Sequence, residues 1–173
     1  MTTKLYAAAA LAALGTMAFA QDGLDVTPTN LAVRFGGLLP IDDELNDFAD
    51  GFAGVGIDVY FTQQYIANSK TYLSIDWLGK SGTGSKGNFF PICLNQKFFL
   101  GKTEEGQPGS YFFVGVGATV FDFYTTNTQF GARAGLGLDL GPHLFAEGTL
   151  FWSDTSTGGI DGTGVGLYLG YRW

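Results

Sequence analysis

The feature that most constrains this chain is a two-residue alternation of apolar with small or polar side chains, repeated along most of its length. The last twelve residues, "GTGVGLYLGYRW", show it clearly, because apolar or aromatic residues occupy the odd positions from Val165 onward while glycine, Tyr168 and Arg172 occupy the even ones. Side chains of a strand point alternately to its two faces, so this pattern predicts β-strands with one strongly apolar face.

About eight such segments occur, separated by clusters of Gly, Asp, Asn, Ser, Thr and Pro that favour turns. We predict strands over Asn30–Leu39, Phe52–Gln63, Lys70–Leu78, Asn88–Leu100, Ser110–Asp122, Thr128–Leu140, Leu144–Trp152 and Gly162–Trp173. The short connections between them predict an all-β, antiparallel, up-and-down arrangement.

The two faces of the predicted strands differ in bulk as well as polarity. One face carries Trp, Phe, Leu, Ile and Val, interrupted by Gln96, Gly37 and Gly148, and the other carries nearly all strand charges and most strand glycines. A soluble eight-stranded barrel of the lipocalin type, which is the alternative, fills its interior with the apolar face. Since so narrow an interior favours small residues, we expect the glycine-rich face inside and the bulky face in lipid, which gives an eight-stranded transmembrane β-barrel.

The inward face holds four basic and four acidic side chains. They are Arg34, Lys97, Arg133 and Arg172, and Asp58, Asp76, Asp139 and Glu147. Because an unpaired charge in a closed lumen is costly, this balance predicts a salt-bridged plug rather than an open pore.

The first twenty residues show a different pattern from the alternating segments. Lys4, an Ala- and Leu-rich run and Ala18-Phe19-Ala20 predict a cleaved secretory signal peptide over 1–20, with a membrane-spanning helix as the alternative. Residues 21–29 form a polar lead-in and 30–173 the barrel domain. The remaining chain has 8 basic and 16 acidic side chains, a net charge of −8, which argues against nucleic acid as a partner.

With these features, residues 30–173 resemble the small eight-stranded outer-membrane β-barrels of diderm bacteria, of the OmpA, OmpX and OmpW type. The stretch "RFGGLLPIDDELND" is also similar to the first strand and loop of the outer-membrane protein β-barrel domain. In that family the barrel-insertion machinery reads a final strand that ends in an aromatic residue, usually phenylalanine. The matching positions here are Val165, Leu167, Leu169, Tyr171 and Trp173.

The resemblance implies outer-membrane lipid and lipopolysaccharide as surroundings, both termini in the periplasm, and outer connections at Pro40–Gly51, Gly79–Gly87, Phe123–Asn127 and Ser153–Asp161. Trp77 and Trp152, near predicted strand ends, are expected to join Tyr171 and Trp173 as aromatic anchors at the membrane interfaces. The outward half of the inner face is rich in glycine, so we expect a shallow vestibule above the charged plug.

Three features of the sequence are candidate chemical sites. His143 is the single histidine and falls in a predicted tight turn, and Cys93, the single cysteine, falls on the inner face; we interpret both as structural. The first outer connection holds five acids, namely Asp42, Asp43, Glu44, Asp47 and Asp50. Calcium binding is the alternative for these carboxylates. The helical spacing of the apolar residues in this connection, with Asp42 as the cap, favours a short helix across the barrel mouth. Lys80 and Lys86 are expected opposite this connection.

The sequence thus predicts an outer-membrane barrel without a catalytic site, cofactor or metal, acting in envelope integrity or surface interaction. The alternative function is binding or transport of a small apolar ligand through the glycine-lined vestibule.

Overall fold

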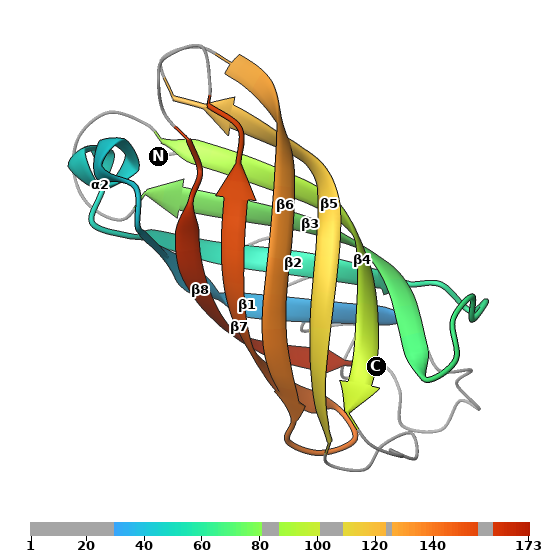
Figure 1. The fold of residues 1–173 in the computed structure, drawn as a ribbon. Helices are drawn as coiled ribbons and strands as arrows, with labels where there is room; N and C mark the ends of the chain where they lie inside the picture. Colours follow the sequence, from blue (N-terminus) through green and yellow to red (C-terminus); the bar gives the residue numbers. More distant parts are fainter. Residues whose placement is uncertain (1–29, 81–86, 101–108, 124–125, 156–160) are drawn as a thin grey trace.

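The computed structural model describes residues 30–80, 87–100, 109–123, 126–155 and 161–173, and these form a closed barrel of eight antiparallel strands in sequence order (Figure 1). The strands are β1 (Leu31–Pro40), β2 (Phe52–Tyr60), β3 (Ser69–Lys80), β4 (Asn88–Leu100), β5 (Ser110–Asp122), β6 (Thr126–Asp139), β7 (Leu144–Ser153) and β8 (Gly164–Arg172). The predicted fold class is confirmed. The predicted signal peptide and lead-in, and most of the connection at 101–109, lie outside the described residues.

The strand boundaries follow the prediction closely, with β4 and β5 identical to it. β2 is shorter than predicted and ends at Tyr60. The chain turns just before β3, where Asn68 has a φ of 55° and the Ser69 hydroxyl donates to the Ile66 carbonyl at 2.7 Å. β3 is longer and reaches Lys80, which pairs with Phe52.

The final strand closes the barrel. β8 pairs with β1 along a continuous register from Ala32 opposite Arg172 to Pro40 opposite Gly164. The Trp173 amide also donates to the Leu31 carbonyl at 3.2 Å. The chain therefore continues as a strand to its last residues because that strand satisfies the free edge of β1.

The barrel has two distinct ends. The start of β1, the end of β8 and the connections 61–68 and 140–143 lie at one end, which we call the termini end, and the helix α2 (Asp43–Phe48) lies at the other, the helix end (Figure 1). The predicted helix is confirmed: the Asp42 carboxylate accepts from the Leu45 amide at 3.2 Å, as an N-cap does.

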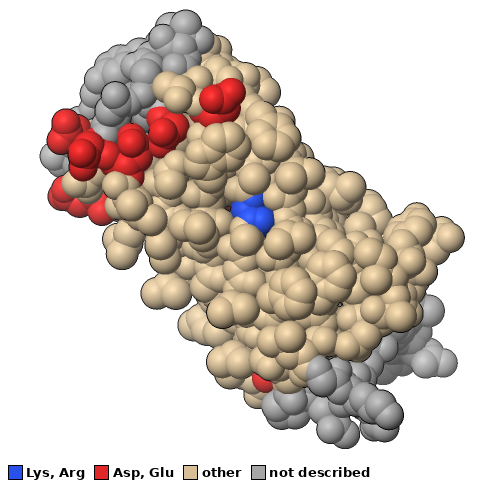
Figure 2. All heavy atoms as spheres, in the orientation of Figure 1, with Lys and Arg blue, Asp and Glu red and all other residues tan. Residues whose placement is uncertain are grey.

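The outer wall between these ends is apolar. Leu, Ile, Val and Phe side chains of every strand are exposed on it, and Figure 2 shows an almost uncharged wall with acidic side chains gathered at the helix end. Such a belt is stable in hydrocarbon rather than in water. No helix within the described residues is long and apolar enough to cross a membrane.

Candidate functional site

Arg34 of β1 occupies the centre of the lumen and contacts three carboxylates. Its Nη2 lies 2.9 Å from Asp76 Oδ1, its Nη1 3.2 Å from Glu147 Oε2 and its Nε 3.0 Å from Asp58 Oδ2. These partners come from β3, β7 and β2, and all four side chains are buried. Such pairing is what makes charges tolerable in a buried site.

A second guanidinium extends this cluster across the barrel. Arg133 of β6 donates from Nη1 to Asp76 Oδ2 at 3.1 Å, so Asp76 links two arginines. Its Nε donates to Asn95 Oδ1 at 2.6 Å and its Nη2 to the Tyr72 hydroxyl at 2.9 Å. Each of the three guanidinium nitrogens therefore has an oxygen partner, which holds the side chain across the lumen.

Lys97 of β4 lies toward the termini end of the cluster. Its Nζ donates to the Tyr60 hydroxyl at 3.1 Å, lies 3.9 Å from Glu147 Oε1 and sits 3.8 Å from the centre of the Tyr111 ring. The Tyr111 hydroxyl in turn donates to Glu147 Oε1 at 3.0 Å. A buried ammonium is thus surrounded by an anion and by the faces of aromatic rings, both of which stabilise the charge.

The remaining predicted charges, Arg172 and Asp139, form a separate pair at the termini end. Arg172 Nη2 lies 3.1 Å from Asp139 Oδ1, and 25% of the arginine side chain is exposed. Each of the eight charged residues singled out in the sequence therefore lies within 4 Å of an opposite charge. The sequence did not single out the uncharged partners Tyr60, Tyr72 and Asn95. Their place on the same inward face as the charges could have indicated them.

Glycines make room for this cluster. A Cβ at Gly137 would collide with the Tyr111 ring, and one at Gly56 would collide with the Asp76 carboxylate. The large side chains therefore lie directly against the bare backbone of neighbouring strands, which explains the glycine-rich inner face.

The helix-end half of the lumen is filled differently. A cluster of buried apolar side chains occupies it, contributed by six strands and α2. Its members are Leu38, Leu45, Ala49, Phe52, Leu78, Phe89, Cys93, Phe121 and Phe151, with Phe48 and Phe123 packed against them. Phe89 is at its centre, with ring centroids 5.0 Å from Phe52, 5.8 Å from Phe121 and 6.1 Å from Phe151.

This apolar plug corrects one expectation. The predicted glycine-lined vestibule is wrong for the described part of the chain, because these side chains occupy the space between the glycines. The inward alternation continues past the glycines to bulky side chains, which fill the space expected to be open; they are Leu38, Phe52, Leu78, Phe89 and Phe121.

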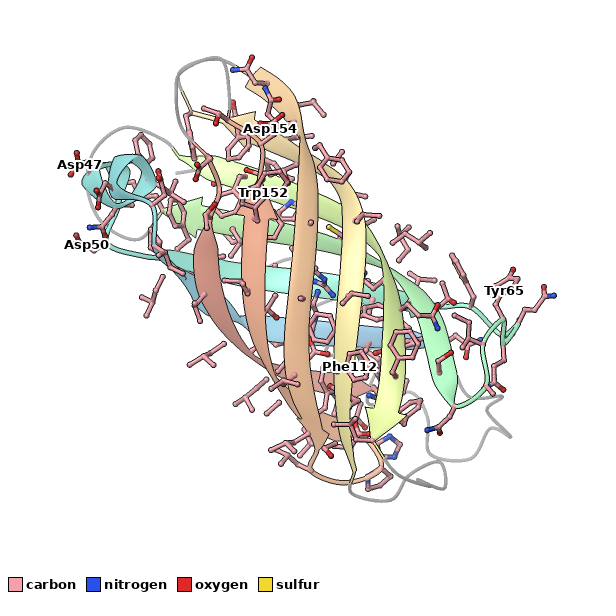
Figure 3. The ribbon with its side chains drawn as sticks, in the orientation of Figure 1. Asp47, Asp50, Tyr65, Phe112, Trp152 and Asp154 are labelled. Atoms are coloured by element: carbon pink, nitrogen blue, oxygen red, sulfur yellow. The ribbon has the colours of Figure 1, made fainter. Side chains whose placement is uncertain are left out.

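The acidic connection contains α2, which the Asp42 carboxylate caps. Leu45 and Ala49 face into the plug, and Asp47 and Asp50 point away from the barrel (Figure 3). No three His, Cys, Asp or Glu side chains of the described ranges converge as metal ligands would. Lys80 lies with its Nζ 4.7 Å from the centre of the Phe48 ring, and Lys86 lies outside the described residues.

Aromatic side chains mark both ends of the wall. Trp152 lies toward the helix end (Figure 3), and Trp77 Nε1 donates to Asn88 Oδ1 at 3.1 Å. At the termini end the Tyr171 ring lies 5.1 Å from Trp173 and 5.4 Å from His143. These side chains lie near the two ends of the apolar wall, and their role as membrane anchors stays a prediction.

His143 and Cys93 lie in different parts of the barrel. His143 Nδ1 lies 2.8 Å from the Arg172 carbonyl oxygen, within hydrogen-bonding distance. Cys93 is buried in the apolar plug, and the donors of Arg133 bind Asp76, Asn95 and Tyr72.

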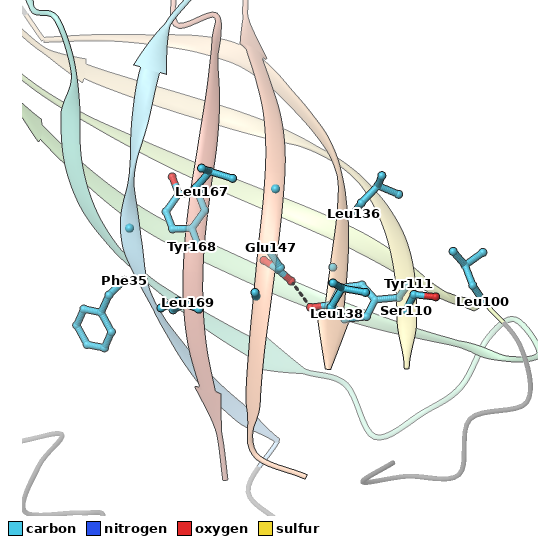
Figure 4. Close-up of a pocket in the computed structure, with 14 residues that line it drawn as sticks. Phe35, Leu100, Ser110, Tyr111, Leu136, Leu138, Glu147, Leu167, Tyr168 and Leu169 are labelled. Carbon is cyan, nitrogen blue, oxygen red and sulfur yellow. Dashed lines mark hydrogen bonds between the residues drawn. The ribbon is translucent and has the colours of Figure 1, made fainter. Parts of the chain in front are cut away.

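The lipid-facing wall contains a groove of about 710 Å³ that the sequence did not predict. Its walls are leucines of β6 and β8 on either side of β7 (Figure 4), and its floor includes Ala146 and Gly148. A second groove, of about 370 Å³, adjoins it at Gly36 and Leu167.

Solved structures share this architecture. The chain is similar to the N-terminal β-barrel domain of Pseudomonas aeruginosa OprF (TM-score 0.53, 15% identity, 85% of this chain and 100% of that one). It is also similar to the outer membrane enzyme PagL (0.59, 8%, 82% and 99%) and to Yersinia pestis Ail in phospholipid bilayer nanodiscs (0.50, 12%, 83% and 98%). No protein-family model matches the sequence, and neither does any curated protein.

At these identities the likeness concerns the fold. The molecule is a small, closed, eight-stranded barrel of the outer-membrane type, as the sequence resemblance implied.

Proposed function

We propose that this chain is an integral outer-membrane protein whose barrel transports no solute and which acts in envelope integrity or surface interaction. One observation carries the proposal: the lumen is occupied at both levels, by the plug around Phe89 and by the charge cluster around Arg34. A barrel filled in this way acts as a membrane-embedded body, and its contacts with the surroundings are made by its wall and its ends.

The proposed orientation places the helix end outside and both termini in the periplasm, following the family resemblance. The termini-end turn at 140–143 is short, as periplasmic turns of such barrels are, although 61–68 at the same end is longer and 123–125 at the helix end is also short. The acidic helix end then faces the medium. The proposed partners are membrane lipid and lipopolysaccharide around the belt, and the insertion machinery at Val165, Leu167, Leu169, Tyr171 and Trp173; nucleic acid and cofactors have no part in it.

Single-channel recording tests the absence of transport. Purified protein, refolded and inserted into a planar bilayer, is expected to give no steady current above that of the protein-free membrane. A reproducible steady conductance of the wild-type barrel would overturn the proposal.

The proposal also includes the absence of catalysis, although one similar structure is described as an enzyme. His143 is the one histidine, and its contacts are with a backbone carbonyl and the Tyr171 ring. A deletion strain that expresses His143→Ala is expected to show the same envelope phenotypes as one that expresses the wild-type protein. A correctly folded His143→Ala barrel that fails to complement would favour an enzyme.

A further inference from the structure

The groove on the outer wall runs obliquely across several strands. It begins beside Leu100 and Ser110, the last residue of β4 and the first of β5, at the termini end. It continues over β6 and β7 to Leu167 on β8 and Phe35 on β1, near the middle of the wall (Figure 4). It is therefore open from the termini-end rim to about half the height of the barrel.

The groove exists because the outward face of β7 is small where its neighbours are large. Ala146 and Gly148 lie opposite Leu138 and Leu136 on one side, and opposite Leu169 and Leu167 on the other. These four leucines are between 55% and 68% exposed, so they stand out from the wall with their inner faces turned toward the floor. A Cβ added at Gly148 would meet one atom, Leu167 Cδ2, at 3.8 Å, so the floor there is open space.

The chemistry of the lining is that of a hydrocarbon site. The polar groups behind the floor are already used: Glu147 accepts from Arg34 and from the Tyr111 hydroxyl inside the lumen. Apart from Ser110 at the entrance, what faces outward is aliphatic and aromatic carbon. The groove is also continuous with the apolar belt, whose established neighbour in this class of barrel is lipid, and its volume lies in the range of small-molecule sites.

We propose that this groove is a binding site for one acyl chain of a phospholipid from the leaflet at the termini end. The chain enters beside Leu100 and Ser110 and lies along Ala146 and Gly148 between the two leucine pairs. This site rests on the membrane location in the proposed function, but it requires neither a filled lumen nor an outward helix end.

Gly148→Leu tests the site by filling the floor. The position has ordinary strand backbone and outward space, so the variant is expected to keep the barrel intact. Ala134→Leu is the matched control, because it adds similar bulk to the outward face of β6 at a position outside the groove. Folding of all three proteins is checked by circular dichroism and by resistance to unfolding in detergent.

Binding is measured on detergent-refolded protein with a phosphatidylethanolamine carrying a nitroxide near the end of one chain. The wild type and Ala134→Leu are expected to immobilise the label equally. Gly148→Leu is expected to bind the lipid about tenfold more weakly, because the methylenes of the acyl chain that lie on the floor lose their burial. Unlabelled lysophosphatidylethanolamine, with its single chain, is expected to compete, and chain-free glycerophosphoethanolamine is not.

Equal immobilisation by all three folded proteins would overturn the proposal. Competition by glycerophosphoethanolamine would also overturn it, since the headgroup would then carry recognition. A wild-type dimer in sedimentation that Gly148→Leu converts to monomer, with unchanged lipid binding, would assign the groove to a second copy of the chain instead.

Discussion

The two halves of the lumen are built by the same strands and the same alternation, yet apolar packing stabilises one half and ion pairs stabilise the other. The helix-end half packs Phe52, Phe89 and Phe121 without directional contacts, and the centre holds Arg34 against three carboxylates through contacts of 2.9–3.2 Å. Apolar packing tolerates small shifts, whereas a buried ion cluster depends on every partner. The comparison teaches that a narrow barrel can be filled by either means, with different sensitivity to substitution.

The largest expected effect is at the centre. Arg34→Met keeps much of the side-chain volume but leaves Asp58, Asp76 and Glu147 buried without their shared cation. We expect a loss of about 3–5 kcal/mol in the free energy of unfolding, measured by urea titration of the refolded barrel. Arg172→Met is the control, since its pair lies at the partly exposed rim and is expected to cost about 1 kcal/mol or less. Equal losses in both variants would contradict the central role of Arg34.

The plug is expected to respond somewhat less. Phe89→Ala removes the ring that contacts four others and should cost about 3 kcal/mol, because a cavity remains. Phe89→Leu refills most of that cavity with another apolar side chain and should recover at least half of the loss. No recovery in the urea midpoint of Phe89→Leu would mean that the plug depends on specific ring geometry, and would weaken the contrast with the centre.

A smaller effect is expected at the helix that closes the plug. Asp42→Ala removes the carboxylate that accepts from the Leu45 amide, and should cost about 1 kcal/mol. Hydrogen exchange of the α2 amides is the sensitive measurement, because loss of the cap frays α2 before the barrel opens. Asp42→Asn is expected to preserve most of the protection; if it behaves as Asp42→Ala does, the cap is not the cause.

The smallest effect is expected at the surface of α2. Lys80→Met removes the ammonium that lies over the Phe48 ring and should cost about 0.5 kcal/mol, since such contacts are weak where solvent reaches them. Lys80→Arg should restore the contact. A loss as large as that of Phe89→Ala would show that Lys80 belongs to the core of the plug.

The sequence by itself determined the faces. Period-two alternation assigned Arg34 inward and Phe35 outward, and the balance of charges on one face predicted that they pair. Even the outward Gln96, an exception in the pattern, is satisfied locally by Thr71 and Ser69 at the termini end. These features depend on strand geometry alone, which the backbone fixes residue by residue.

Tertiary structure alone decided depth and partnership. Arg133 of β6 reaches Asp76 of β3 across the lumen, a pairing between strands that are not neighbours and that no local pattern encodes. The same holds for the plug, where Phe89 meets Phe151 from β7, and for the wall groove, where small residues of β7 matter only because leucines of β6 and β8 flank them. Alternation says which way a side chain points, but the register and tilt of eight closed strands decide what it meets there.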